Sequence, residues 1–464
     1  MTKVSGLKNP AVVLAACVLV NLTIQILYVW SLLRVELLNP EQWNWSSTQA
    51  GLPFTLVLVF FATGALIGGR LQDKFGPRWV ATAGGLMVGA GLMLSGILTG
   101  VLGEGPSLLA GAYNYVEGYG YLPVYGSPIG IALAFGVLTG LGIGFCYGSV
   151  LPCGLKWYHP SKKGLIGGMV LGGFALASVI YAPVTGWLLS NFTIEQTFMY
   201  LGVGVAIVSF IFAQFVTNPP EGFVPAEPKN LAGAAVTEAP IDFDFKAMLK
   251  TRVFYLMFAT FALVASIGLM MLGNIAHIAN VQLEAGGVLE GANYSFLGLI
   301  AIGTFLISFV AVINTAGRIA GGSLSDKIGR INTLLIAIVL QMGTMLAFFW
   351  FQSVWLLVIG FALVGLCFGV FLTMFPALTG DQFGLKNYGF NYGIMYMAYA
   401  VAGLIAPNIA DILFEIQGDF LITYLVCAAM MVVAIVLTLL LKKALDERNL
   451  ELDEMRKAGV TEAA

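Results

Sequence analysis

Long apolar segments alternate with short polar ones along almost the whole chain. Each apolar segment has about 20 residues or more, which is the length that a helix needs to cross a hydrocarbon core about 30 Å thick. The pattern predicts an all-α integral membrane protein with twelve transmembrane helices, at residues 11–33, 51–71, 79–103, 129–152, 165–190, 197–217, 253–280, 296–322, 332–351, 354–378, 391–416 and 420–442.

The longest polar segment, residues 218–250, separates these predicted helices into six and six. Its prolines, alanines and charged residues cannot bury a core, so it should be a linker. We predict an N-terminal six-helix half at 1–217, a cytoplasmic linker at 218–250, a C-terminal six-helix half at 251–444 and a cytoplasmic tail at 445–464. A further connection, residues 104–128, holds five tyrosines among glycines, and we expect it to pack over the outer mouth, as interfacial tyrosines do.

Two short segments repeat at corresponding places in these halves. One follows the second predicted helix and the other follows the eighth, and in them Gly68, Gly69, Leu71, Asp73, Lys74 and Gly76 align with Gly321, Gly322, Leu324, Asp326, Lys327 and Gly329. Two similar six-helix halves are typical of transporters whose halves rock around a central site. In this register Arg318 aligns with Ala65 and Asn314 with Phe61, so the arginine belongs to one half only.

Arg318 lies inside the otherwise apolar eighth helix. It precedes Asp326 by eight residues, which places it about 12 Å into the membrane, close to the midplane. An isolated guanidinium at that depth costs at least a few kcal/mol, so it should face a cavity and a partner. Asn314, four residues earlier, lies on the same helix face and can orient it. Arg318 is therefore our first candidate for binding an anionic substrate; the alternative is a structural arginine paired with a helix carbonyl or a buried acid.

Composition and charge support a membrane location. The chain is 59% hydrophobic and 10% charged, against about 25% charged residues in soluble domains, and its net charge of -2 leaves no basic face for nucleic acid. All of the 22 lysines and arginines except Arg34 and Arg318 fall on one side if the amino terminus is cytoplasmic. By the positive-inside rule we predict a multi-pass protein of the plasma (inner) membrane with both termini cytoplasmic. The first apolar segment is too long for a signal peptide, so we expect it to remain as a span.

The sequence shows no pattern typical of a disulfide framework, a metal site, a nucleotide-binding site or a catalytic site. The five cysteines lie within apolar segments without a close pair, and His159 and His277 are far apart, so neither a disulfide framework nor a metal site is expected. The sequence has no P-loop, no Rossmann fingerprint and no nucleophile–base pair at membrane depth. We therefore expect a protein that is not an enzyme, needs no cofactor and runs on a gradient or on exchange.

The two GxLxDxxG turns resemble the signature loop of the major facilitator superfamily, which stands between its second and third and again between its eighth and ninth helices. In that family the aspartate caps a neighbouring helix and pairs with basic residues at the inner gate. The resemblance assigns gating roles to Asp73, Arg78, Asp326 and Arg330. A plain charged turn at the interface is the simpler alternative.

Further segments look like the oxalate/formate antiporter family, which is related to the monocarboxylate transporters. They are Gly51-Leu-Pro-Phe-Thr, Lys156-Trp-Tyr before Lys163-Gly-Leu, and Phe383-Gly-Leu-Lys-Asn-Tyr-Gly-Phe-Asn-Tyr-Gly393. In both groups an arginine of the eighth helix binds the substrate carboxylate, and Arg318 stands at that position.

Three departures narrow what this resemblance implies. Tyr399 stands where the oxalate exchanger has a second cation, a lysine, and one buried positive charge suits one carboxylate. Asn314 stands where monocarboxylate transporters have an aspartate, and Leu32 where they have a lysine, so proton coupling stays open. We predict a secondary transporter of small monocarboxylates of the lactate, pyruvate or formate type, working by alternating access. An oxalate/formate-type anion exchanger is the alternative, and a membrane sensor that binds a metabolite is a third, weaker reading.

Other polar side chains complete the predicted substrate site. Tyr392, Tyr396 and Tyr399 recur at i, i+4 and i+7 and so share one face of the eleventh helix, although helix packing explains such a face equally well. The remaining candidates are polar residues inside predicted helices: Gln25 and Tyr28 in the first, Tyr147 in the fourth, and Asn274 and His277 in the seventh. The expected partners are a small carboxylate, with or without protons, and the lipid bilayer; we expect a monomer.

Overall fold

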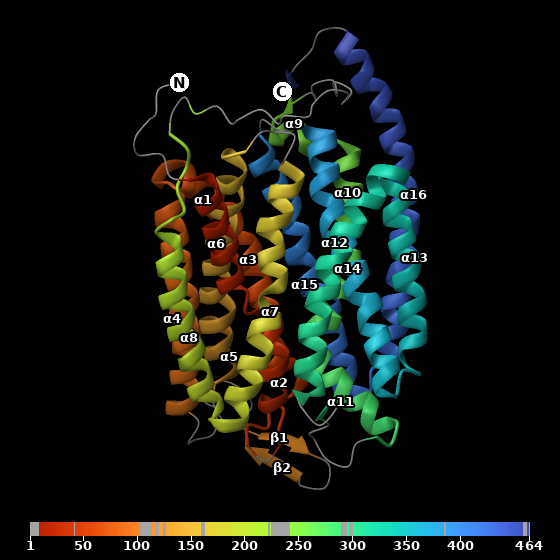
Figure 1. Ribbon diagram of the computed structural model, residues 1–464. Coiled ribbons are helices and arrows are strands. Elements are labelled where there is room, and N and C mark those ends of the chain that lie inside the picture. Colours follow the sequence, from red (N-terminus) through yellow and green to blue (C-terminus); the bar gives the residue numbers. More distant parts are fainter. Residues whose placement is uncertain are drawn as a thin grey trace.

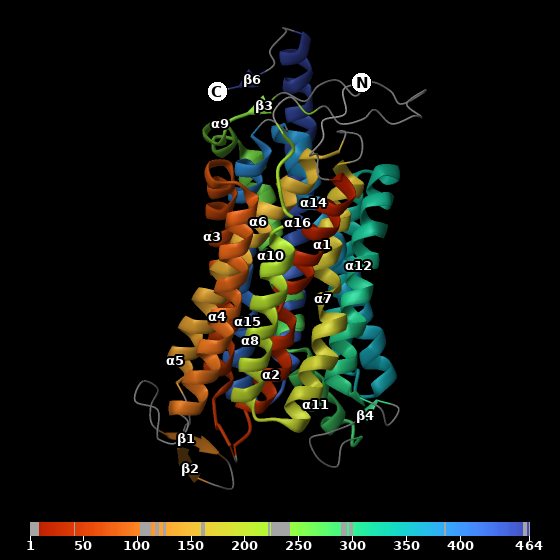
Figure 2. The same cartoon turned by 60° about the vertical axis from the view of Figure 1, so that its left-hand side comes forward.

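The computed structural model describes residues 9–40, 42–102, 113–116, 120–123, 127–158, 163–220, 223, 242–288, 295–296, 300–384, 387–457 and 462–463. The helices stand nearly parallel in one bundle (Figures 1 and 2). Among the described residues, twelve helices are long and apolar enough to cross a membrane. This confirms the predicted all-α fold with twelve transmembrane helices.

Two sets of helices build the bundle. The first set comprises α1 (Pro10–Ile24), the 3-10 helix η1 (Leu27–Val29), α2 (Trp30–Leu37), α3 (Ser47–Phe75), α4 (Pro77–Leu102), α5 (Pro128–Ile131), the π-helix η2 (Ala132–Thr139), α6 (Gly140–Lys156), α7 (Lys163–Asn191) and α8 (Ile194–Ala213). The second set comprises α10 (Arg252–Gly273), α11 (Ile275–Ala285), α12 (Ile302–Ile328), α13 (Arg330–Phe348), α14 (Val354–Phe383), α15 (Tyr388–Gln417) and α16 (Leu421–Lys457).

Short elements lie at the two ends of the bundle. The tyrosine-rich connection, where described, is a β-hairpin of β1 (Tyr113–Val116) and β2 (Gly120–Pro123) at one end, and the rest of it lies outside the described residues. The short helix α9 (Phe245–Leu249) marks the opposite end (Figure 1). The other strand pairs are β3 (Asp242–Phe243) with β6 (Glu462–Ala463), and β4 (Ser295–Phe296) with β5 (Ile300–Ala301).

The first transmembrane span is not the continuous helix that its apolar pattern predicts. It breaks after Ile24, where the Gln25 side-chain oxygen accepts a hydrogen bond from the backbone N–H of Leu27 at 2.7 Å. The chain then continues through η1 into α2. Broken spans are common where transporters bind their substrates, because the break turns side chains toward a cavity.

The repeated turns have the same backbone geometry in both sets. Gly76 and Gly329 end α3 and α12 with φ of 81° and 87° and donate their N–H groups to the carbonyls of Gln72 and Ser325 at 2.9 and 3.0 Å. A side chain would strain that conformation, so each position requires glycine. The sequence repeat is therefore also a structural repeat.

The two sets meet along α3 and α15, and along α7 and α12. In the middle of the first pair, the Phe61 ring of α3 lies 5.6 Å from the Tyr396 ring and 6.1 Å from the Tyr399 ring of α15. Next to them, Gly393 of α15 faces Leu66 of α3. This seam places side chains of both sets around the centre of the molecule.

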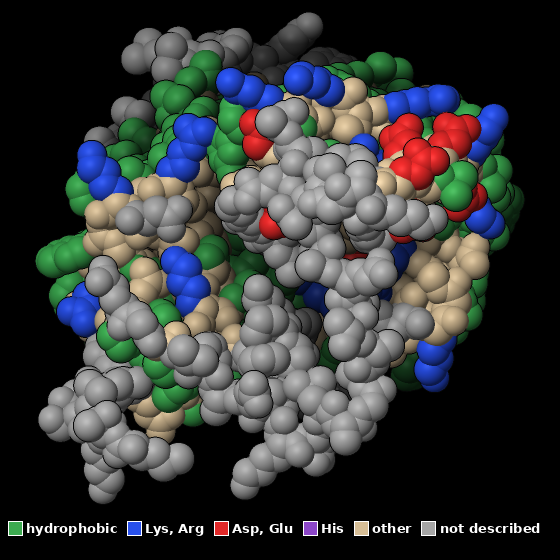
Figure 3. Space-filling view, turned by 90° about the horizontal axis from the view of Figure 1, so that it is seen from above, with side chains coloured by type: hydrophobic (Ala, Val, Ile, Leu, Met, Phe, Trp, Pro, Cys, Tyr) green, Lys and Arg blue, Asp and Glu red, His purple; other side chains and the backbone are tan. Residues whose placement is uncertain are grey.

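The outer surface suits a lipid bilayer. Large apolar side chains such as Ile319, Trp350 and Ile416 point outward with 68%, 68% and 73% of their surface exposed. Lysine and arginine side chains surround the end of the bundle where α9 lies (Figure 3). The chain is a multi-pass membrane protein; that this end is cytoplasmic stays a prediction. All five cysteines are free and buried.

Candidate substrate site

Arg318 lies on α12 where this helix packs closely on α14. A side chain at Gly317 would clash with the Leu366 carbonyl, and one at Gly369 would clash with the Asn314 carbonyl and lie 2.9 Å from the Arg318 amide nitrogen. The hydroxyl of Thr373 on α14 also donates to the Arg318 carbonyl at 3.3 Å. The backbone that carries Arg318 is thus held on one side by direct helix contact.

The guanidinium of Arg318 is oriented by a neutral side chain. Its Nε donates to Oδ1 of Asn314 at 3.1 Å, and the Asn314 amide in turn donates to the Gly365 carbonyl of α14 at 3.3 Å. Asn314 is buried, whereas Arg318 is partly exposed. In the described part of the chain no acidic side chain forms an ion pair with Arg318. Its terminal nitrogens are therefore available to an anion.

A cavity in the centre of the bundle collects Arg318 and five tyrosines. Its lining residues come from both helix sets: Tyr28 of η1, Tyr147 of α6, Phe174 of α7, Arg318 of α12, Leu372 of α14, and Tyr392, Tyr396 and Tyr399 of α15. The free space has room for little more than a single water molecule. A ligand larger than a few atoms would have to displace side chains as it binds.

Stacked rings hold the tyrosines of this cavity together. The Tyr396 and Tyr399 rings stack with centroids 5.0 Å apart and planes 10° apart, and Tyr147 stacks on Tyr396 at 5.7 Å. Phe61 meets the edge of Tyr147 at 5.2 Å. Among the described residues, the lining thus combines one cation with several phenol hydroxyls, which can donate hydrogen bonds, and holds no acidic group. This arrangement favours an anion.

Four predicted site residues lie outside the cavity lining: Asn314, which holds Arg318, and then Gln25, Asn274 and His277. Gln25 caps the break in the first span. Asn274, at the junction of α10 and α11, donates to the Met270 carbonyl at 3.1 Å. His277 packs its ring against Phe414 and Phe420, at 4.4 and 5.4 Å. Each of these last three also keeps a buried polar atom, Nε2 of Gln25, Oδ1 of Asn274 and Nδ1 of His277, without a hydrogen-bond partner among the described residues. Their roles as substrate ligands stay predictions.

A sequence model of the Major Facilitator Superfamily matches residues 11–316 and 301–462. The chain belongs to the Major Facilitator Superfamily. The Oxalobacter formigenes oxalate:formate antiporter is 26% identical over 382 residues, covering 81% of this chain and 78% of the antiporter. An uncharacterised transporter of the superfamily from Escherichia coli, YhjX, is 25% identical over 81% of both chains. Monocarboxylate transporter 12 of Xenopus laevis is 22% identical over 79% of this chain and 75% of its own.

Solved structures of other superfamily members share the fold. A variant of the nucleoside transporter NupG superimposes with a TM-score of 0.65 at 12% identity, over 93% of this chain and 100% of NupG. A bacterial homologue of the lysosomal transporter Spinster, in an inward-facing conformation, gives a TM-score of 0.61 at 14% identity, over 95% of this chain and 98% of its own. At such identities the likeness supports the architecture alone.

The structure describes the side chains of only two of the four predicted gating residues, Arg78 and Arg330. The side chains of Asp73 and Asp326 lie outside the described part of the structure. Arg330 donates to the Ser325 hydroxyl and to Asp381 at 3.4 Å, while Nε of Arg78 is buried without an acceptor among the described residues. The gating roles of these residues stay predictions.

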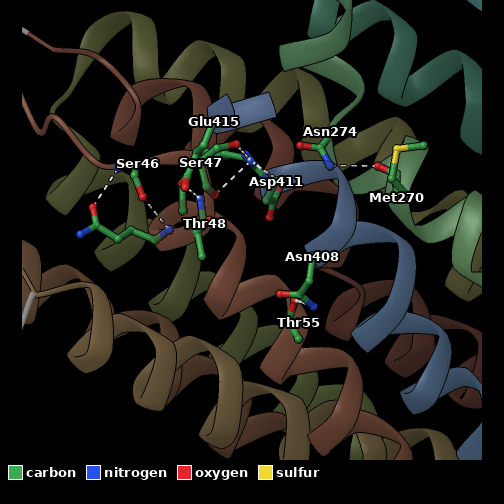
Figure 4. A network of polar contacts seen from close by, with 12 residues as sticks. Ser46, Ser47, Thr48, Thr55, Met270, Asn274, Asn408, Asp411 and Glu415 are labelled. Atoms are coloured by element: carbon green, nitrogen blue, oxygen red, sulfur yellow. Dashed lines mark hydrogen bonds and ion pairs between the residues drawn. The ribbon is translucent and has the colours of Figure 1, made fainter. Parts of the chain in front are cut away.

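The sequence missed a buried ion pair near the end of the bundle where the β1–β2 hairpin lies. Nη2 of Arg34 on α2 lies 2.7 Å from Oδ1 of Asp411 on α15, and the two side chains are 2% and 1% exposed. Figure 4 shows Asp411 beside Ser47, with Glu415 nearby accepting from the Thr48 backbone. In the sequence, Arg34 is an exception to the positive-inside pattern. The sequence could not identify the partner, because Asp411 lies 377 residues away along the chain.

Proposed function

We propose that this member of the superfamily moves small monocarboxylates across the membrane by alternating access, and that Arg318 binds the carboxylate. The observation that carries the proposal is a single guanidinium, oriented by Asn314 and without an acidic partner among the described residues, in a tyrosine-lined cavity between the two helix sets. A guanidinium fork matches the two oxygens of a carboxylate.

The charge and size of the cavity favour formate, lactate or pyruvate over larger or doubly charged acids. Its described lining residues include one cation, and Tyr399 stands where the resemblance to the oxalate exchanger would place a second. A second carboxylate would be desolvated without a partner, which costs several kcal/mol. Because the space is small, each additional substrate atom also requires the tyrosine rings to move.

In this mechanism the anion enters between the sets and replaces water at Arg318. Two parallel hydrogen bonds to the guanidinium fix the carboxylate, and hydroxyls of Tyr28, Tyr147, Tyr396 or Tyr399 bind the remaining lone pairs or a 2-hydroxyl group. Neutralising Arg318 removes the main cost of burying the site. The two sets can then rock about the α3–α15 and α7–α12 seams and expose the anion on the other side.

An oxalate/formate-type exchanger is the second candidate. The kinship with the protein named oxalate:formate antiporter favours it, and the single cation of the cavity lining opposes it. Strong inhibition of lactate or formate counterflow by oxalate would support this second candidate over a monocarboxylate transporter.

Counterflow of labelled C1 to C4 acids in proteoliposomes tests the proposal. We expect Arg318→Ala to lower carboxylate counterflow by about 30-fold or more, because losing a charge-assisted pair costs roughly 2–5 kcal/mol. Arg318→Lys should keep part of the activity, since it retains the charge but not the fork. Arg252→Ala, at an exposed helix end, is the matched control. Wild-type counterflow by Arg318→Ala would refute the assignment.

A further inference from the structure

Arg34 is a second buried arginine on the route to the cavity. It lies six residues after Tyr28, about 9 Å farther toward the end of the bundle that carries the β1–β2 hairpin. By the predicted orientation this is the outer end. An anion entering there to reach Tyr28 and Arg318 must pass the level of Arg34.

The contacts of Arg34 divide between the two helix sets. Ser47 of α3, in the same set, accepts from Nη2 through its hydroxyl at 2.6 Å and through its carbonyl at 3.1 Å. The Trp30 indole of α2 donates to the Ala50 carbonyl of α3 at 3.0 Å and ties these two helices together. Asp411, by contrast, belongs to α15 of the second set. When the sets part at this end, Arg34 keeps Ser47 and loses Asp411.

Asp411 lies directly against the α3 backbone. A side chain at Gly51 of α3 would clash with its Oδ2, which has no hydrogen-bond partner among the described residues. Asn408, one turn away on α15, donates to the Thr55 hydroxyl of α3 at 3.1 Å (Figure 4). Closure at this end therefore brings α15 onto α3 and places one carboxylate oxygen on Arg34.

Opening this end leaves a preorganised guanidinium that has lost a carboxylate. Leaving a guanidinium unpaired in such a site is unfavourable unless water or another anion replaces the partner. The proposed substrate carries the same chemical group as Asp411. We propose that Arg34 is a second carboxylate-binding residue, occupied by Asp411 when this end is closed and by the substrate carboxylate when it is open. This inference rests on the proposed function and extends it to the path of the substrate.

The test is the direction in which two substitutions move the Michaelis constant. Initial lactate or formate uptake is measured in right-side-out and inside-out vesicles that hold saturating counter-substrate. Arg34→Gln should raise the KM at the outer face by about tenfold, because it removes a charge-assisted hydrogen-bond donor. Asp411→Asn should lower that KM severalfold, because the internal competitor loses its charge. The KM at the inner face should stay within about twofold in both variants, since Arg318 is untouched.

If the Arg34–Asp411 pair closes the outer end and Arg34 does not bind substrate, a different result is expected. Both substitutions break the same ion pair, so both would then shift the outer KM in the same direction, and that result would overturn the inference. Gly51→Ala offers a second route, since it displaces Asp411 without changing a charge and should also lower the outer KM. Gly172→Ala on α7, whose added Cβ meets nothing within 4 Å, is its matched control.

Failure of this inference can be told apart from failure of the proposed function. If the chain does not carry monocarboxylates, the unsubstituted protein shows no lactate or formate counterflow from either face. If only the role of Arg34 is wrong, the unsubstituted protein transports normally and Arg34→Gln leaves the outer KM unchanged. Thermal unfolding in detergent reports on folding, and Arg34→Lys replaces Arg34→Gln if the latter is unstable, with a smaller rise in outer KM expected.

Discussion

Two arginines inside the membrane have opposite surroundings. Arg34 is neutralised by the carboxylate of Asp411, whereas the described part of the chain gives the guanidinium of Arg318 a neutral partner, the amide of Asn314, and no acidic one. An amide can hold Nε in place but cannot supply a negative charge. The free energy of burying Arg318 therefore depends on what enters the cavity, while that of Arg34 is already offset by the protein.

Asn314 is predicted to act by positioning Arg318. Asn314→Leu removes the acceptor of Nε and should weaken substrate binding by about 10-fold, in line with roughly 1.5 kcal/mol for a hydrogen bond to a charged group. Asn314→Asp keeps an acceptor but competes with the substrate for the guanidinium, so it should weaken binding further. Binding is measured by substrate protection against thermal unfolding. Undiminished protection in Asn314→Leu would contradict the positioning role.

At the level of helices, α15 both holds the end of the linker and contributes tyrosines to the cavity. Toward the α9 end, Asn387 and Asn391 donate to the Phe243 carbonyl of β3 at 3.2 and 2.9 Å, and Arg448 of α16 lies over the Phe243 ring at 4.6 Å. The tyrosines of the same helix face the cavity. The asparagines of the two Asn-Tyr-Gly segments thus anchor the end of the linker, and Tyr392 of the second segment lines the proposed site.

The close packing of α12 on α14 should be sensitive to a single methyl group. Gly369→Ala places a Cβ against the backbone of Asn314 and Arg318, and neither helix can yield without moving the guanidinium. We expect a loss of about 1–3 kcal/mol in stability, seen as a lower melting temperature, together with a strong loss of counterflow. Gly343→Ala on α13, where an added Cβ meets nothing within 4 Å, should be neutral or slightly stabilising. Equal behaviour of the two variants would refute the packing argument.

In the whole molecule, the α3–α15 seam is closed on both sides of the cavity. The Arg34–Asp411 pair closes it near the hairpin end, and at the opposite end the Arg70 guanidinium of α3 lies over the Phe390 ring of α15 at 4.2 Å. The tyrosine cluster lies between these two contacts. Transport requires each contact to open in turn, so the energy of the closed, empty molecule matters for the rate.

The free energy of the closed, empty molecule predicts that this protein exchanges one monocarboxylate for another. An empty cavity leaves Arg318 without a counter-charge, and burying it unpaired makes the empty return slow. We therefore expect internal monocarboxylate to accelerate uptake into proteoliposomes by about tenfold or more, and an imposed pH gradient without counter-substrate to drive little uptake. Asn314→Asp supplies an internal negative charge and should reduce the acceleration. Rapid gradient-driven uptake by the unsubstituted protein would point instead to proton symport.

Much of the architecture was predictable, because it depends on local sequence. The apolar segments predict the transmembrane helices, because the solvation of each residue by lipid or water depends little on residues far away in the sequence. The repeated glycines predict the two turns that Gly76 and Gly329 form, because only glycine adopts that backbone easily. The spacing of Tyr392, Tyr396 and Tyr399 predicts the shared face that lines the cavity.

Other features depend on which distant helix faces meet, and no local pattern records that. Gln25, Asn274 and His277 were predicted as ligands, but the fold places them at a helix break, a helix junction and an aromatic pocket, outside the cavity lining, and their roles as ligands stay predictions. The Arg34–Asp411 pair joins α2 to α15 through two residues that are 377 positions apart in the sequence. The sequence therefore determined the spans and the repeat, because hydropathy and backbone preference act locally. Tertiary structure alone decided which polar groups share a cavity and which neutralise one another, because burial and pairing are properties of the assembled bundle.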